Sequence, residues 1–419
     1  MNPENRVEFT KDMKDYTLLA PNMADVHFSI LCNVFGHYGY KVELLKNDGR
    51  SVVDMGLKYV HNDTCYPALL VIGQLIDALE SGKYDPNKTA LLITQSGGGC
   101  RASNYIHLLR KALKKAGYPQ VPVISLNLSG LEKNSGFKIR LSMALKMLYG
   151  MIYADLIMLL KNQVEPYEVN KGDAKRLTQK WINDVSAMMS KGKGFSMKEA
   201  RKVLPEITKT YANIKVSKTE KVRVGVVGEI YVKYSALANN HLEEFLASQD
   251  CEVMVPGLLG FFLFKVDNRL EDVKLYGGKW IKKVAMKVAM WYLTRFETEL
   301  ISAAKAYGDF CVPATYQHIK EKCTKIIGAG CKMGEGWLLT AEMMELIESG
   351  YGNIVCAQPF GCLPNHIVGK GMIRKLKELY PESNIVPIDY DPGATKVNQE
   401  NRIKLMLAVA QENLNKQSE

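Results

Sequence analysis

The chain has 419 residues, of which 47% are hydrophobic and 24% charged, with nine cysteines and a formal net charge of +11. This length is sufficient for two or three domains, and the composition is that of an ordinary soluble globular protein. The cysteines are odd in number and irregularly spaced, and the polar N-terminus lacks a signal-peptide core, which argues against a secreted disulfide scaffold. We therefore expect a cytoplasmic protein.

The lysines are spread along the chain rather than grouped in blocks, and no RNA- or DNA-binding fingerprint is present. We expect no nucleic-acid partner; the positive charge indicates either a solvated surface or a docking face for an acidic partner protein. The most apolar stretch, residues 143–160, contains Lys146 and Asp155 and favours a buried or interface helix over a membrane span. We expect no membrane association.

Residues 1–130 alternate short apolar runs with helical patterns. This alternation is typical of an α/β domain with a mostly parallel sheet. The predicted strands are residues 16–20, 41–45, 89–93 and 121–126, and the predicted helices are residues 26–35, 67–79 and 102–115.

Residues 131–220 are helical in pattern and rich in methionine. Met143, Met147 and Met151 recur at a spacing of four, which indicates a helix core or interface. We interpret this region as a helical connector or insertion.

Residues 221–419 repeat the α/β alternation and predict a second domain of the same class. No internal sequence repeat is convincing, but the two α/β units are expected to be alike in structure. The predicted strands are residues 222–227, 252–255, 353–357 and 384–388, and the predicted helices are residues 236–247, 280–307, 367–379 and 398–414.

A glycine-rich turn follows the predicted strand 89–93. Gly97, Gly98 and Gly99 let the backbone bend sharply and approach a bulky group, either a cofactor or a phosphate. Cys100 lies at the exit of this turn near a helix N-terminus, where a thiolate is favoured.

Two further cysteines lie on similar connections. Cys65 directly precedes a helix that opens at Tyr66-Pro67, and Cys362 follows the strand 353–357 after a Pro-Phe-Gly turn. Because ligands of open α/β sheets bind at the carboxyl ends of the strands, Cys65, Cys100 and Cys362 can converge in an interdomain cleft and hold an iron–sulfur cluster.

The alternative is that the cysteines are scattered core residues. We favour this interpretation for Cys32 and Cys251, which lie inside amphipathic or strand patterns. Cys331 lies in the glycine-dense loop 328–337, and Cys356 lies inside a strand, where it is either a ligand or a packed thiol. No CxxC pair is present, so spacing alone does not decide between a cluster and a core.

Four segments resemble the superfamily of 2-hydroxyacyl-CoA dehydratases and benzoyl-CoA reductases, in particular its activator-associated branch. The resemblance covers nearly the whole chain, and its cysteine loops are specific. The segments are His61-Asn62-Asp63-Thr64-Cys65-Tyr66-Pro67, residues 94–105, Gly334-Glu335-Gly336-Trp337 and residues 358–364.

The resemblance implies two Rossmann-like domains that clasp a [4Fe–4S] cluster or, in one branch, a double-cubane cluster in the interdomain cleft. In the dehydratases two early loops and one late loop each supply a cysteine. Cys65 and Cys100 match the early pair; Cys362 or Cys356 fills the late place, and Cys362 is favoured because it lies beyond the strand. Cys331 leaves room for a larger cluster.

The resemblance also implies a function in an anaerobic electron-transfer system. A separate ATPase activator with its own iron–sulfur cluster supplies a low-potential electron, which this chain uses for reduction or radical dehydration of a small substrate. The chain would then be an ATP-driven reductase or a dehydratase-like lyase, as a homodimer or with a related subunit. Its loops depart from those of the dehydratases, so their substrate and acyl-CoA pocket are not carried over.

Two alternatives remain at this stage: a non-catalytic electron-transfer or assembly subunit of such a system, and a nucleotide-binding α/β protein. His61 and Glu335 are candidates for acid/base roles or for structural hydrogen bonds. Asp391-Pro392-Gly393-Ala394-Thr395 resembles the phosphate loop of actin-like ATPases, but it follows a late strand, and no GxxxxGK[ST] motif is present.

Overall fold

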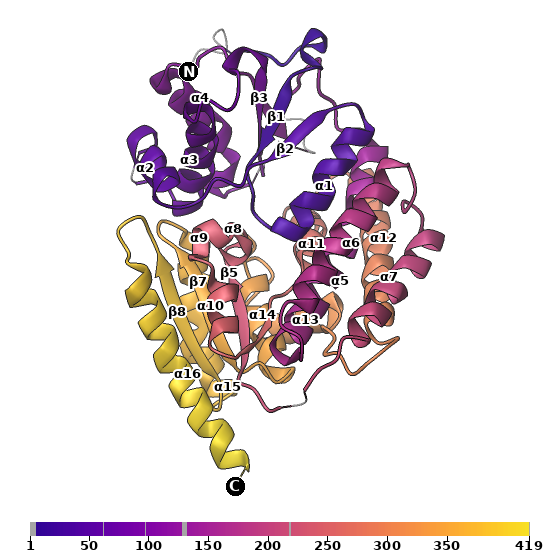
Figure 1. Ribbon diagram of the computed structural model, residues 1–419, viewed down its shortest axis with the longest axis vertical. Coiled ribbons are helices and arrows are strands. Elements are labelled where there is room, and N and C mark those ends of the chain that lie inside the picture. Colours follow the sequence, from indigo (N-terminus) through magenta and orange to yellow (C-terminus); the bar gives the residue numbers. More distant parts are fainter. Residues whose placement is uncertain (1–5, 62, 97, 128–131, 218, 419) are drawn as a thin grey trace.

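The computed structural model describes residues 6–61, 63–96, 98–127, 132–217 and 219–418. Two α/β units lie one above the other, and a layer of long helices lies beside both (Figure 1). Each unit is built on a four-stranded parallel sheet, as the alternating pattern predicts. The strands are β1 (Thr17–Ala20), β2 (Lys41–Leu44), β3 (Thr89–Thr94) and β4 (Val123–Leu126) in the N-terminal unit, and β5 (Arg223–Gly228), β6 (Glu252–Met254), β7 (Asn353–Pro359) and β8 (Asn384–Tyr390) in the C-terminal unit.

The two sheets have the same strand order. It is β2-β1-β3-β4 in the N-terminal unit and β6-β5-β7-β8 in the C-terminal unit. In each sheet the two central strands are the ones from which the chain winds outward in opposite directions. The loops that follow β1 and β3, or β5 and β7, therefore flank a topological switch point, where open α/β sheets bind ligands.

Each unit has a buried helix that leads into its third strand. In the N-terminal unit this helix is α3 (Tyr66–Glu80), whose nearly unbroken apolar sequence explains why almost all of it is buried. Its crossing with α2 (Arg50–Tyr59) depends on Gly73, where a Cβ atom would lie 2.2 Å from the carbonyl oxygen of Val52. The counterpart is α14 (Leu338–Glu348), which is buried to a similar extent and leads into β7.

The helical layer combines two separate parts of the chain. It contains α5 (Leu141–Val164), α6 (Asp173–Ser190) and α7 (Met197–Ala212), as expected for the connector, but also α11 (Leu258–Tyr276) and α12 (Trp280–Ala304). The last two helices lie within the stretch assigned to the second α/β domain and pack on α5 and α7 instead. A purely sequential division of the chain therefore does not describe this layer.

The central helix of the layer is α5. The segment Leu141–Tyr167 is long and apolar enough to cross a membrane, but 72% of its most apolar window is buried inside the protein. Its Asp155 carboxylate bonds Nε2 of His27 on α1 (Asp25–His37) at 2.8 Å and accepts hydrogen bonds from the amides of Leu258 and Leu259. One buried carboxylate thus joins α1, α5 and α11, and the apolar stretch is a core helix, as its two charged residues predict.

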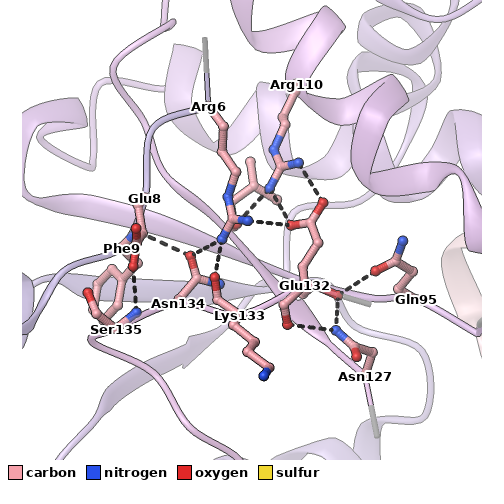
Figure 2. Close-up of polar contacts among 12 residues, drawn as sticks. Arg6, Glu8, Phe9, Gln95, Arg110, Asn127, Glu132, Lys133, Asn134 and Ser135 are labelled. Carbon is pink, nitrogen blue, oxygen red and sulfur yellow. Dashed lines mark hydrogen bonds and ion pairs between the residues drawn. The ribbon is translucent and has the colours of Figure 1, made fainter. Parts of the chain in front are cut away.

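An ion-pair network holds the connection between the N-terminal sheet and α5 (Figure 2). Both oxygens of Glu132 accept hydrogen bonds from Arg110, at 2.8 and 2.7 Å, and Arg6 approaches the same carboxylate from the other side. Burial alone would raise the pKa of Glu132, but the hydrogen bonds and charge of Arg110 outweigh it and lower the pKa. The network ties the N-terminal segment and α4 (Tyr105–Ala116) to this connection.

Three predicted helices are interrupted in the structure. Residues 101–103 form a separate 3-10 turn before α4, and residues 365–369 form a π turn before α15. Asn240 and His241 adopt φ values of 56° and 61°, left-handed conformations that end one helix and begin the next. The other helices are α8 (Ile230–Tyr234), α9 (Ala236–Asn239), α10 (Leu242–Ser248), α13 (Tyr316–Cys323), α15 (Ile373–Leu379) and α16 (Lys396–Ser418).

Candidate functional site

Three of the predicted cysteines lie on loops at the contact between the two α/β units. Cys65 is the N-cap residue of α3, and Cys100 is the N-cap residue of the 3-10 turn Arg101–Ser103. Cys362 follows β7 in the C-terminal unit. All three occupy the strand-end and helix-start positions that the sequence predicts.

The loops of Cys65 and Cys362 touch each other. The amide of Tyr66 donates a hydrogen bond of 3.0 Å to the carbonyl oxygen of Phe360. Gly361 adopts a φ of 74°, and a Cβ atom at this position would lie only 3.1 Å from Cα of Cys65. Glycine therefore meets two requirements here, a left-handed turn and a close approach between the two units.

The glycine turn before Cys100 is closed by its own side chains. Nε2 of Gln95 donates to the carbonyl oxygen of Ser103, and the Ser103 hydroxyl accepts from the amide of Gly98 and donates to its carbonyl oxygen. A Cβ atom at Gly99 would lie 2.5 Å from the sulfur of Met333, whereas Gly98 faces open space. Gly97, the third glycine of this prediction, lies outside the described residues.

A partly buried carboxylate that the sequence did not indicate acts electrostatically on all three thiols. Glu229 follows β5 and caps α8 by accepting a hydrogen bond of 2.9 Å from the amide of Val232. Burial, and then the negative charge of Glu335, raise its pKa to about 8. The charge of Glu229 in turn raises the pKa of Cys65, Cys100 and Cys362.

The expectation of a favoured thiolate at these helix starts is wrong for the chain by itself. Burial has the largest influence on the pKa of each thiol. It raises the pKa of Cys65 and Cys362, and it raises the pKa of Cys100 to about 11. The partial positive charge of a helix N-terminus lowers a thiol pKa only modestly. Burial beside two carboxylates raises the pKa by more than this. A bound metal would reverse this balance, because coordination deprotonates thiols directly.

Side chains hydrogen-bond the sulfurs of Cys65 and Cys362. The Tyr105 hydroxyl lies 2.9 Å from Sγ of Cys65, and Nδ2 of Asn365 donates to Sγ of Cys362 at 3.3 Å. Nδ2 of Asn365 also lies 3.4 Å from Oε2 of Glu335. Such contacts orient sulfur ligands and tune the potential of a centre that they bind.

The loop 328–337 brings Glu335 into the same site. Gly334 and Gly336 adopt φ values of 62° and 52°, and a Cβ atom at Gly336 would lie 2.4 Å from the carbonyl oxygen of Cys331. Oε1 of Glu335 accepts a hydrogen bond of 3.0 Å from the amide of Ile230. Glu335 is thus buried beside the thiols, whereas the Cys331 thiol is exposed.

A lysine from the helical layer completes the surroundings. Nζ of Lys265 on α11 donates a hydrogen bond of 2.6 Å to the carbonyl oxygen of Gly334. Burial lowers its pKa, while the charges of Glu335 and Cys100 oppose the decrease. Nothing in the local pattern around Lys265 or Glu229 indicates this proximity, because it arises from packing between distant segments.

The remaining candidates lie elsewhere. His61 is exposed, pairs with Asp63 at 3.4 Å, and lines a separate cavity of about 390 Å³ with Lys58, Lys111 and Lys115. Cys356 is fully buried within β7, where burial raises its pKa to about 12, and Gly369 packs against its sulfur. Of the two late cysteines, Cys362 is therefore the one at the contact between the units.

The actin-like motif has a local structural role. Oδ1 of Asp391 accepts hydrogen bonds from the amides of Gly393 and Ala394, at 2.7 and 2.9 Å, in the turn between β8 and α16. This arrangement gives no support to a phosphate-binding role for the motif.

Within the described part of the chain, no group of three or more His, Cys, Asp or Glu side chains is arranged to hold a single metal ion. The ligands of an iron–sulfur cluster bind different iron atoms at separate corners, so this result does not test a cluster. No protein-family model and no curated protein sequence matches the chain.

Proposed function

We propose that this chain is an iron–sulfur protein in which Cys65, Cys100 and Cys362 hold a [4Fe–4S] cluster between the two α/β units. In this proposal it accepts low-potential electrons from a separate ATPase activator for the reduction or radical dehydration of a small substrate. The observation that carries the proposal is the contact of the Cys65 loop with the Cys362 loop, and of the Cys100 loop with Met333, beside the partly buried carboxylate of Glu229.

The residues present fit such a cluster. Three thiols supply the ligand type that iron–sulfur clusters require, and Tyr105 and Asn365 hydrogen-bond two of the sulfurs. When bound, a cluster with three protein thiolates supplies electron transfer and leaves one iron with an exchangeable position for a substrate oxygen. Cys331 and Cys356 lie outside this set, so a single cubane fits the chain better than a double one.

The carboxylates explain why a dedicated electron donor is needed. Negative charge beside a cluster makes the addition of an electron less favourable and lowers the reduction potential. Glu335 lies next to the thiols and supplies such a charge, and Glu229 adds a second charge when it loses its proton, so we expect a potential below the range of ordinary donors. An activator that couples ATP hydrolysis to electron injection meets this need.

The carboxyl group of Glu229 can also accept and donate a proton. With a pKa of about 8, Glu229 holds its proton near neutral pH, and Oε2 is fixed by the amide of Val232. A carboxyl group that is poised near the working pH is suited to general acid/base catalysis. We therefore assign Glu229, rather than His61, as the first acid/base candidate of the site.

Apolar side chains around the cysteine loops offer a docking area for the activator. Phe360, Leu363 and Ile367 are exposed close to Cys362 in sequence, and Met333 is exposed beside Gly99. An exposed apolar group of this kind next to a buried site is typical of a protein–protein contact. Docking there would bring the donor close to the thiols.

The absorption spectrum of anaerobically purified protein tests the cluster. We expect a broad brown band near about 400 nm and bound iron and sulfide. Electron paramagnetic resonance of the protein mixed with an activator, ATP and a low-potential donor then tests the mechanism. Reduction at the same rate without ATP or activator would leave a simple electron carrier.

A further inference from the structure

The N-terminal part of α12 exposes a row of large apolar side chains. Their exposed fractions are 72% for Trp280, 61% for Ile281, 48% for Val284 and 58% for both Val288 and Trp291. At 100° per residue these positions fall within about a third of the helix circumference, so they form one continuous stripe. We call these five residues the α12 stripe.

The opposite face of α12 is already packed. Leu293, Phe296 and Leu300 are buried. The ring centroid of Phe296 lies 4.8 Å from that of Tyr149 on α5. A helix that is apolar on both faces is normally covered on both. The α12 stripe is therefore not needed for the packing of this chain.

The stripe continues onto the hairpin that joins α11 to α12. Gly277 and Gly278 adopt φ values of 75° and 156°, which allows the tight turn between the two helices. Leu275 and Tyr276 precede this turn and are 50% and 77% exposed. Apolar and aromatic side chains thus lie on both sides of the hairpin tip.

The charged residues of the segment that carries the stripe have a single sign, although Lys274 pairs with Glu271, which precedes the segment, at 3.5 Å. No Asp or Glu occurs between residues 273 and 296, whereas this segment contains five lysines and one arginine, all exposed. Lys283 and Lys287 fall along one edge of the stripe by the same helical geometry. Arg295 lies over the ring of Trp291 at 5.0 Å. The cations are Lys274, Lys279, Lys282, Lys283, Lys287 and Arg295.

Contrary to the expectation of no membrane association, we propose that the α12 stripe and its lysines form a peripheral docking surface for an anionic lipid bilayer. An apolar stripe with tryptophan, bordered by lysine, is the pattern of helices that lie in the membrane interface. Tyrosine and tryptophan favour the headgroup level, and lysines near the surface are attracted to anionic lipids.

Two observations favour lipid over a protein partner. Lysine is depleted in protein–protein interfaces, yet it supplies five of the six cations here. Antiparallel pairing of two α12 stripes about a twofold axis would place the lysine edges of both copies on the same side. Like charges at that distance repel, which disfavours a second copy as the occupant.

Sedimentation with lipid vesicles tests the proposal. The full-length protein should bind vesicles of phosphatidylcholine and phosphatidylglycerol, and binding should weaken as salt rises. Its affinity for vesicles of phosphatidylcholine alone should be lower by about tenfold or more. Trp280→Ser combined with Trp291→Ser, and Lys283→Glu combined with Lys287→Glu, should each reduce binding by about tenfold or more.

Matched controls separate this effect from general surface changes. Leu141→Ser changes a 77% exposed apolar residue outside the stripe, and Lys114→Glu with Lys115→Glu changes two exposed lysines of α4; both variants should bind like the wild type. Wild-type protein that stays in solution with anionic vesicles would overturn the proposal. If the wild type does not bind vesicles but sediments as a dimer, and the tryptophan variant sediments as a monomer, the stripe would be assigned to a second copy instead.

Discussion

The two α/β units share one strand order but present different groups at equivalent positions. Cys100 follows β3 and Cys362 follows β7, the third strand of each unit. Before the buried helix that leads into this strand, however, the N-terminal unit places Cys65 and the C-terminal unit places Glu335. The N-terminal unit thus contributes two thiols to the site, and the C-terminal unit contributes one thiol and, with Glu229, two carboxylates.

This difference teaches how a repeated frame acquires an asymmetric site. The shared topology brings the same loops of each unit to their contact, whatever side chains they carry. The side chains then divide the tasks: thiols that can bind iron come mainly from one unit, and carboxylates that set charge and hold a proton come from the other. Variants in each unit can test that division.

The largest effect is expected for cysteines at equivalent loops. Cys65→Ser and Cys100→Ser should lose most of the bound iron, because each removes one of three proposed ligands. Cys331→Ser, in the C-terminal loop that corresponds to that of Cys65, should retain the iron, because its thiol is exposed. Iron and acid-labile sulfide per chain after anaerobic purification provide the measurement. Loss of iron in the Cys331 variant as well would make the two units alike and favour a larger cluster.

A smaller effect is expected from the carboxyl group of the C-terminal unit. The pKa of Glu229 rises from its ordinary value of 4.5 to about 8 on folding, so the folded chain binds more protons than the unfolded chain between these values. The stability of the metal-free protein should therefore fall as pH rises from 4.5 to about 8.

Glu229→Gln should flatten this decline, because the amide does not titrate while its oxygen can still accept the hydrogen bond from Val232. Thermal unfolding followed by circular dichroism across this pH range is the measurement. An identical pH profile in the variant would show that the carboxyl group is already ionised in the folded chain.

The smallest effect is expected from the hydrogen bonds to sulfur, one in each unit. Tyr105→Phe removes the partner of Cys65, and Asn365→Ala removes the partner of Cys362. Both variants should keep their iron but show a more negative reduction potential, because hydrogen bonds to sulfur stabilise the reduced cluster. A redox titration compares them with the wild type, and unchanged potentials in both would mean that these contacts do not persist around a bound cluster.

Much of the fold could be predicted from local patterns. Apolar runs located the ends of all eight predicted strands to within two residues. The Tyr66-Pro67 pair marked the start of α3. The break at Asn240 and His241 was missed because left-handed residues leave no trace in hydrophobic periodicity. The membership of α11 and α12 in the helical layer was missed because it is decided by packing against α5 and α7.

The site was predictable only in part for the same reason. A cysteine after a strand or before a helix is a local feature, and it placed Cys65, Cys100 and Cys362 at the correct ends of their elements. The approach of Glu229 to these thiols depends on how the two units meet, which no periodicity encodes. The thiol pKa expectation was wrong because helix position is visible in the sequence and burial beside carboxylates is not.

The most direct test of the central claim compares the two late cysteines. Iron per chain should be measured in wild-type protein, Cys362→Ser and Cys356→Ser, all purified anaerobically and reconstituted in the same way. We predict that the wild type and Cys356→Ser contain iron and that Cys362→Ser has lost most of it, because of these two cysteines only Cys362 lies at the contact between the units. Equal iron in the two variants, or a wild type without iron, would contradict it.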